Sequence, residues 1–184
     1  LDNEQYDGYF RDRCVFRPEI DIEDTMNVQV KYSNSVTMSY SLNAFNSWEG
    51  YYVIFNGTKG RLEHKIEEMM YVSGDGGIQG GIKPGGEYIK IFPIRGTPSE
   101  VEVWKGEGGH GGGDILMLHD IFDPVKKPDK YLRCADQRAG AYSLLTGVAA
   151  NYSMKSGKEI KINDLVKNIG MPDYPIMPNH KEPV

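Results

Sequence analysis

The sequence has little positive charge and no long apolar run. Its 184 residues contain 21 Lys and Arg against 26 Asp and Glu, which leaves a net charge of −5. Without a basic excess there is no broad face that tracks phosphates, so we do not expect a nucleic-acid partner. The longest strictly apolar stretches, such as residues 115–118, have four residues, whereas about 20 are needed to cross a bilayer. A membrane span is therefore not expected.

Cysteine is also scarce. Cys14 and Cys134 could form one bridge at most and have no CxxC spacing, so neither a disulfide scaffold nor a zinc ribbon is indicated. The chain opens on Leu1, and residues 1–4 have neither the charge nor the apolar core of a signal peptide. We therefore expect a piece of a longer cytoplasmic protein. A periplasmic or exported location is the alternative if the missing N-terminus carries a signal.

What the chain does contain is alternation of apolar and polar residues, which is typical of half-buried strands. A polar turn at residues 33–35, in which Asn34 tolerates left-handed geometry, and an Asn-Gly turn at Asn56 predict two hairpins. Because the tight connections are hairpin-like, we expect one largely antiparallel sheet. The six expected strands span residues 25–32, 36–44, 51–55, 61–65, 88–94 and 100–104.

One face of the first hairpin is rich in hydroxyls and almost uncharged. It carries Thr37, Ser39, Ser41 and Asn43, whereas solvated faces normally hold more Lys and Glu. Such a face can meet water, a polyol or another subunit, and we expect a second subunit.

Helices are predicted late in the chain, over residues 114–122 and 136–156. Asp136 is a suitable N-cap and Gly157 a suitable stop for the longer helix. Its apolar stripe should lie on the sheet, with Gly140 and Gly147 where another element comes close. The predicted fold is therefore α+β, an antiparallel sheet of about six strands with helices packed on one face. Residues 1–170 form the domain, and residues 171–184 form a proline-rich extended tail.

Residues 106–114 form the most unusual segment, with six glycines in its first eight positions. The segment formally satisfies GxGxxG, but no parallel strand follows it, so we do not expect dinucleotide binding here. Glycines also let a backbone pass close to a ligand, with His110 and Asp114 projecting into the same small volume. That pair suits proton transfer or sugar recognition. The alternative is a flexible turn in which Asp114 caps the helix.

A metal site is the next possibility, since five His and Asp side chains crowd into fourteen residues. His119 lies well off the helical face of Asp114, and no HExxH motif is present, so we expect no metal. There is no GxSxG, and neither cysteine neighbours a histidine, which argues against nucleophilic catalysis. The five side chains considered for the metal site are His110, Asp114, His119, Asp120 and Asp123.

Taken in order, six motifs resemble the C-terminal domain of the Gfo/Idh/MocA oxidoreductases. They are residues 21–26 (DIEDTM), 37–45, 48–51 (WEGY), 55–63 (FNGTKGRLE), 108–114 (GGHGGGD) and 138–141 (RAGA). The resemblance implies a parent protein with an N-terminal Rossmann domain that holds NAD or NADP. It also implies an α+β domain that contributes substrate contacts and a subunit interface. The family's catalytic lysine and Asp-x-x-x-His pair have no match here, so the chain alone is expected to bind no cofactor and to be inactive.

From this resemblance we expect the substrate-side and oligomerisation domain of an NAD(P)-dependent sugar or polyol oxidoreductase. Its partners would be its own Rossmann domain, the substrate and further copies of itself. The expected substrate contacts are His110, Asp114, Arg138, Trp48 and Asn43, with His110 as a possible catalytic residue. Two alternatives stay open: a nicotinamide-dependent glycoside hydrolase of the same family, and a carbohydrate-binding or structural domain. The sequence leaves the sugar, the choice of NAD or NADP and the oligomer size undetermined.

Overall fold

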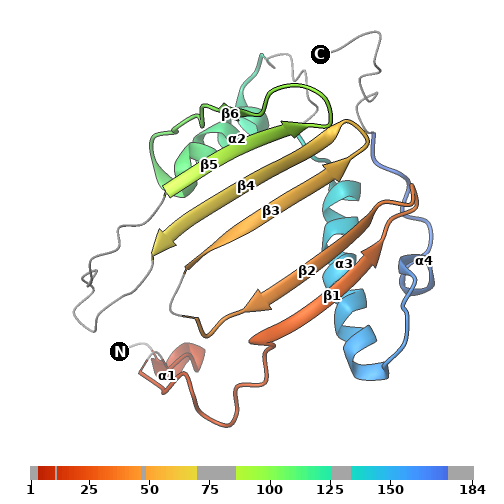
Figure 1. Ribbon diagram of the computed structural model, residues 1–184. Coiled ribbons are helices and arrows are strands. Elements are labelled where there is room, and N and C mark those ends of the chain that lie inside the picture. Colours follow the sequence, from red (N-terminus) through yellow and green to blue (C-terminus); the bar gives the residue numbers. More distant parts are fainter. Residues whose placement is uncertain (1–3, 11, 47–48, 70–85, 126–133, 174–184) are drawn as a thin grey trace. The chain divides into compact units, whose positions relative to one another are not determined.

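The computed structural model describes residues 4–10, 12–46, 49–69, 86–125 and 134–173 (Figure 1). They fall into two compact units, Leu1–Val103 and Trp104–Val184. The first unit holds a short helix, α1 (Glu4–Asp7), and all of the described strands. The second holds the glycine-rich segment and the remaining helices. Each unit is described by itself.

The first hairpin of the first unit is a two-stranded antiparallel sheet of β1 (Thr25–Lys31) and β2 (Thr37–Asn43). Thr25 pairs with Asn43 and Lys31 with Thr37, so the apolar residues of both strands share one face. The turn differs from expectation at one position. Ser35 is the left-handed residue, with φ 70°, while the Asn34 side chain accepts a hydrogen bond from the backbone N–H of Val36 at 3.1 Å.

A second, four-stranded antiparallel sheet follows, in the order β3-β4-β5-β6. Its strands are β3 (Glu49–Gly57), β4 (Gly60–Met69), β5 (Gly86–Pro93) and β6 (Ser99–Val101). The turn between β3 and β4 ends on Gly60, with φ 156°. A Cβ at this position would lie 2.4 Å from the Phe92 carbonyl oxygen on β5, so the approach of the two strands requires glycine there.

The two faces of this sheet differ in chemistry. Strand pairing places Leu62 between Phe55 and Ile91 on one face, and Glu63 between Ile54 and Lys90 on the other. Along β4 the second face alternates in charge, and its neighbours pair with each other. Arg61 Nε donates to Glu63 Oε1 at 2.6 Å, and Lys65 pairs with the buried Glu67. The hydrogen bond to Glu67 is the main cause of a raised pKa at Lys65.

The second unit contains a 3-10 turn (Gly109–Gly112) followed by α2 (Gly113–Phe122), α3 (Gln137–Ser156) and α4 (Ile162–Leu165). The expected cap of α3 is confirmed, because Asp136 Oδ1 accepts from the backbone N–H groups of Arg138 and Ala139 at 2.9 and 3.0 Å. Its end is confirmed as well, since Gly157 is left-handed with φ 67°.

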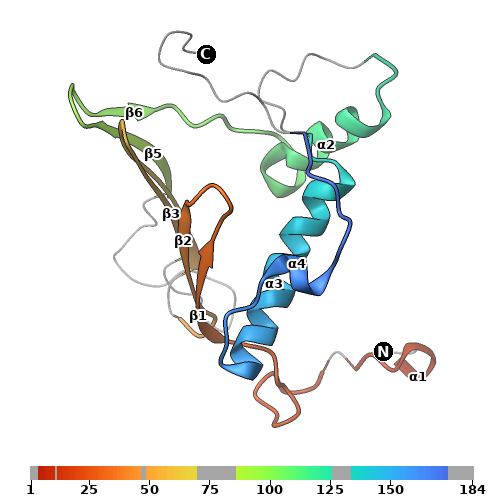
Figure 2. The ribbon, with the colours of Figure 1, turned by 90° about the vertical axis from the view of Figure 1, so that its right-hand side faces the viewer.

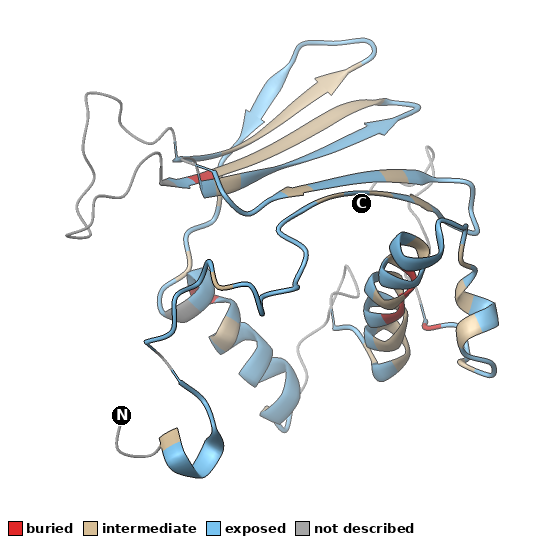
Figure 3. Ribbon diagram, turned by 90° about the horizontal axis from the view of Figure 1, so that it is seen from below, coloured by how far each residue is buried: buried red, intermediate tan, exposed pale blue. Residues whose placement is uncertain are grey.

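Fewer residues of α3 are buried than the apolar stripe predicted for this helix contains. Leu145 and Ala149 are buried, whereas Leu144 is 70% exposed and Tyr152 is 53% exposed. Figure 3 shows most of the described ribbon as exposed or intermediate, with short buried stretches. Within the second unit, a Cβ at Gly140 or Gly147 would meet no heavy atom within 4 Å. A close approach of the sheet to these two glycines stays a prediction.

The α+β class, the six strands and their antiparallel pairing are confirmed. The strands differ from the prediction in forming two sheets, since β2 and β3 do not pair in the part of the chain that is described. Packing of the helices on one face of the sheet stays a prediction. Among the described residues, no helix combines the length and apolar character that crossing a membrane requires.

Candidate functional site

The glycine-rich segment of the second unit closes on itself through its own backbone. A Cβ on Gly106 would lie 2.2 Å from the carbonyl oxygen of Gly111 and 2.9 Å from the Cα of Gly112. A Cβ on Gly112 would lie 2.8 Å from the Cα of Gly106. These distances are too short for a real Cβ at either position, so residues 106 and 112 must be glycine for the loop to close.

His110 stands at the tip of this closed loop in a backbone conformation that side chains rarely adopt. Its φ and ψ are 50° and 42°, in the left-handed region, which costs a residue with a Cβ roughly 1–2 kcal/mol. Strain of this kind concentrates at functional sites, where the surrounding structure enforces it. Here the neighbouring Gly111 and Gly112 are left-handed too, with φ 63° and 86°.

The His110 side chain forms a dyad with Asp114, in the first turn of α2. The Nδ1 atom of His110 lies 3.0 Å from Oδ1 and 2.9 Å from Oδ2 of Asp114. An ionised carboxylate only accepts hydrogen bonds, so in the neutral imidazole Nδ1 carries the proton and Nε2 keeps its lone pair. The His110 side chain is 86% exposed and that of Asp114 is 46% exposed. The dyad therefore presents a hydrogen-bond acceptor, Nε2, to an approaching molecule.

The expected alternative role of Asp114 as the helix cap is not what the structure shows. The N-cap of α2 is Gly112, which has no side chain to cap with, and Asp114 lies inside the first turn. Its carboxylate is therefore left to hold the imidazole of His110. An acidic residue there also interacts favourably with the partial positive charge of the helix N-terminus.

The glycine-rich segment does not fit a dinucleotide. The strand before it, β6, pairs antiparallel with β5, and no parallel strand pair occurs among the residues that are described. A dinucleotide cleft requires a βαβ unit with an open glycine turn at the pyrophosphate, whereas Gly106 and Gly112 fill this turn with backbone. The glycines serve loop closure and the presentation of His110.

A second pair of the same type lies at the other end of α2. His119 Nδ1 and Asp123 Oδ2 are 3.0 Å apart, again four residues along the chain. Within the described ranges, no three His, Cys, Asp or Glu side chains converge as a metal site would require. His119 sits on regular helix without backbone strain, so it offers a natural comparison for His110.

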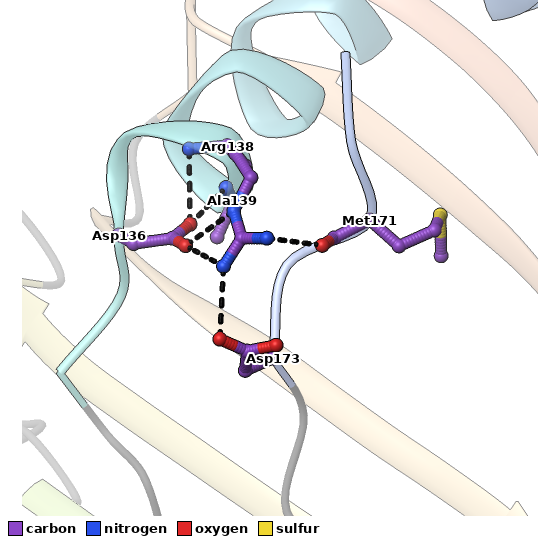
Figure 4. A network of polar contacts seen from close by, with 5 residues as sticks. All are labelled: Asp136, Arg138, Ala139, Met171 and Asp173. Atoms are coloured by element: carbon purple, nitrogen blue, oxygen red, sulfur yellow. Dashed lines mark hydrogen bonds and ion pairs between the residues drawn. The ribbon is translucent and has the colours of Figure 1, made fainter.

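Arg138 is held by the protein on three sides (Figure 4). Its Nε donates to Asp136 Oδ2 at 2.6 Å, its Nη1 to the Met171 carbonyl at 2.7 Å and its Nη2 to Asp173 Oδ2 at 3.0 Å. The bonds to Asp136 and then Asp173 raise the pKa of Arg138. The pKa of Asp136 is lowered, first by the backbone N–H of Ala139 and then by Arg138.

These bonds tie the segment after α4 to the start of α3. Tyr142, one helical turn beyond Arg138, donates from its hydroxyl to the Ile169 carbonyl at 3.2 Å. The segment therefore runs back along α3 (Figure 2), with alternate carbonyls taken by residues four apart on the helix. Two residues of extended chain and four residues of helix both advance about 6 Å, so the spacing of the two carbonyls matches the spacing of the two helical side chains that donate to them. The sequence analysis missed this role of Arg138 and Tyr142.

The other expected contacts lie elsewhere. Asn43, at the end of β2, helps to line a hollow in the first unit together with Ala44, Asn46, Glu49 and Gly50. Trp48 lies outside the described residues. Of the five expected substrate contacts, the structure brings His110 and Asp114 into direct contact with each other. Contact of any of the five with substrate stays a prediction.

Comparison with known proteins identifies the family to which the chain belongs. Residues 2–162 match the family model described as "Oxidoreductase family, C-terminal alpha/beta domain", so the chain belongs to this family. It is 35% identical to "Putative oxidoreductase YteT" of Bacillus subtilis over 167 residues, which is 87% of this chain and 36% of that protein. It is 26% identical to "2,7-anhydro-N-acetylneuraminate hydratase" of Escherichia coli over 148 residues, 68% of this chain and 37% of that protein.

The chain thus spans about a third of the length of these curated relatives. No solved structure gives a significant match. The predicted resemblance to the family is confirmed over nearly the whole chain.

The lowered pKa of Asp136 predicts an acid-sensitive helix cap. A carboxylate whose pKa falls on folding stabilises the folded state above its ordinary pKa of 3.8, and that contribution is lost as pH falls through the lowered value. Asp136→Asn keeps a capping oxygen but removes the charge. We expect urea unfolding to show the variant clearly less stable than wild type at pH 7 and less destabilised at about pH 3, because the contribution of the charge decreases as pH falls below the ordinary pKa of 3.8.

Asp21→Asn, at an exposed position outside the helices and strands, is the control and should change stability equally little at both pH values. A destabilisation of Asp136→Asn that is the same at both pH values would show that the charge of Asp136 has no part in the cap.

Proposed function

We propose that this chain is the substrate-side domain of an NAD(P)-dependent sugar or polyol oxidoreductase, and that the His110–Asp114 dyad acts at the substrate. The observation that carries the proposal is a strained histidine whose Nδ1 is held by a carboxylate and whose side chain is 86% exposed. Membership of an oxidoreductase family supports the proposed class of reaction. The hydratase relative is named for a sugar derivative, which supports a carbohydrate as substrate.

The chain's own contribution would be to bind a hydroxyl group and to move its proton. As the alcohol carbon gives up a hydride to the nicotinamide that the Rossmann domain would hold, Nε2 of His110 would accept the hydroxyl proton, and it would return that proton in the reverse direction. Asp114 stabilises the imidazolium that forms, because the charge on the ring then faces a carboxylate at 2.9 Å. NAD or NADP would belong to an N-terminal Rossmann domain of a longer protein, since the glycine-rich segment of this chain does not fit a dinucleotide.

The remaining expected contacts are secondary parts of this proposal. The Arg138 guanidinium already has three protein acceptors, so its contribution would be to hold the start of α3 and leave at most one face to a substrate. Asn43 has an exposed amide beside the hollow of the first unit, where a substrate hydroxyl could bind. Trp48 is proposed only from the family resemblance.

A second candidate function is supported by the hydratase relative. Addition of water to an anhydro sugar, or hydrolysis of a glycoside, also needs a group that moves a proton at a sugar oxygen. The same dyad serves that step with Nε2 as base or, once protonated, as acid. A carbohydrate-binding domain without catalysis is the third reading, and turnover measurements separate it from the other two.

Self-association is part of the proposal. On the hydroxyl-rich face of β2, Ser39 donates to Gln29 Oε1 of β1 at 2.9 Å. Strand pairing adds Lys31, opposite Thr37, as the one charged residue that the two strands place on this face. Polar surfaces of low charge occur at subunit interfaces, because few ions have to be desolvated. We propose that this face meets a second copy of the chain.

The central prediction concerns His110. In a longer protein that carries the Rossmann domain, His110→Ala should lower kcat/KM at least about tenfold, since a lost proton acceptor costs about 1.4 kcal/mol or more. Folding stability should be unchanged or higher, because the exposed side chain fills no cavity and its backbone is strained. Turnover should be assayed with sugars, polyols and aryl glycosides in the presence of NAD and NADP.

His119→Ala is the matched control, because it removes the same type of His–Asp pair from regular helix, and it should leave turnover unchanged. Asp114→Asn should reduce turnover in the same direction as His110→Ala. Equal kcat/KM for wild type and His110→Ala on a true substrate would show that the loop is only a turn.

The interface prediction concerns charge on the β2 face. Ser39→Lys combined with Ser41→Glu should shift the protein toward monomer in analytical ultracentrifugation, because each copy would have to desolvate new charges. The double change Lys158→Glu and Glu159→Lys, at exposed positions of the second unit, is the control and should leave the distribution as in wild type. A monomeric wild type, or a double variant that associates as wild type does, would contradict the interface.

A further inference from the structure

Trp104 lies directly against the loop that carries the His110–Asp114 dyad. The point that a Cβ on Gly106 would occupy is 2.8 Å from Cη2 of the Trp104 indole and 2.2 Å from the Gly111 carbonyl oxygen. Two atoms so close to one point are neighbours, and Gly111 directly follows His110. Gly106 is therefore the place where the indole edge and the tip of the loop meet, and any side chain there would separate them.

The indole of Trp104 is not part of a buried core. It follows β6, lies outside any helix or strand, and is 66% exposed. Among the described residues, no aromatic ring stacks on it. An exposed tryptophan leaves a large apolar surface in water, and tryptophans of this kind are enriched where a ligand covers the ring.

We infer that Trp104 is the apolar platform of the site, and that the substrate is a ring sugar rather than an acyclic polyol. This inference rests on the function proposed for His110 and narrows its substrate class. A pyranose has a flat face of C–H bonds and a rim of hydroxyl groups. Stacked on the indole, its C–H face is removed from water while a rim hydroxyl reaches His110 Nε2.

The platform also explains why the loop is built from glycines. Gly106 brings the aromatic surface against the loop that carries His110, so one contact to the sugar's ring face and one to its edge would fix its orientation. An acyclic polyol offers the same hydroxyls but no flat face, and it would lose rotational freedom on binding. Ring sugars should therefore bind more tightly than the alditols derived from them.

The inference is tested by NMR titration of the 15N-labelled 184-residue chain, after circular dichroism has shown that wild type and variants fold alike. The probes are the methyl pyranosides of glucose, galactose and N-acetylglucosamine, with glucitol and galactitol as acyclic comparisons. We expect the Trp104 indole Nε1–H resonance, assigned with Trp104→Phe, to shift saturably with at least one pyranoside. The alditols should bind at least about tenfold more weakly.

The variants separate stacking from general stability. Trp104→Ala should raise the Kd for the bound pyranoside about tenfold, and Trp104→Phe should stay within about threefold of wild type, because a smaller ring still stacks. Phe122→Ala removes another exposed aromatic ring and should leave the Kd unchanged. Gly106→Ala should weaken binding as Trp104→Ala does, whereas Gly113→Ala, which meets no neighbour, should not.

Equal affinity for pyranosides and alditols, unchanged affinity in Trp104→Ala, or no saturable binding of any pyranoside would each overturn the inference. Its failure is distinct from that of the proposed function. If His110→Ala abolishes turnover in the longer protein while Trp104→Ala leaves KM unchanged, the dyad stands and the platform is wrong. If Trp104→Ala raises KM but His110→Ala is fully active, the platform stands and the proton-transfer role is wrong.

Discussion

The close backbone approach between Gly106 and Gly111–Gly112 is the constraint on which the candidate site depends. It leaves no room for a Cβ at either end of the loop, and it forces three consecutive residues, His110 to Gly112, into left-handed geometry. His110 alone among these three bears a side chain, and it accepts a cost of roughly 1–2 kcal/mol to stand there. The helix that follows immediately supplies Asp114 at hydrogen-bond distance from the imidazole. Loop closure thereby holds the backbone of His110 in one conformation, with its imidazole against Asp114.

The second unit fixes its helices by polar bonds more than by an apolar core. Leu145, Ala149 and Pro172 are its buried apolar side chains in the described ranges, while Arg138 and Tyr142 hold the returning segment through its backbone carbonyls. Large apolar side chains stay exposed in both units, among them Tyr52 and Phe55 of β3 and Phe122 of α2. Exposed apolar surface on this scale is typical of a domain that packs against other domains or subunits. That agrees with a chain about a third as long as its relatives.

Much of the fold could be predicted because local signals decide it. The alternation of apolar and polar residues predicted the strands, and the Asn-Gly turn predicted the β3–β4 hairpin. Asp136 and Gly157 predicted the two ends of α3. The sequence also pointed to His110 and Asp114, since few residues other than glycine surround them. The closure at Gly106, the left-handed turn at Ser35 and the contacts of Arg138 with Met171 and Asp173 could not be predicted, because each depends on residues that meet only after folding. Trp104 was overlooked for the same reason, since it was expected inside a strand.

The most direct test of this account is the protonation of the His110 imidazole, read from its 15N chemical shifts in the histidine-labelled chain at about pH 8, where an imidazole is neutral. The account predicts that Nδ1 carries the proton and Nε2 does not. It further predicts that Gly106→Ala, which prevents loop closure, loses this preference while Gly113→Ala retains it. A wild-type His110 protonated at Nε2, as free imidazole side chains mostly are, would contradict the claim that the loop fixes a proton acceptor.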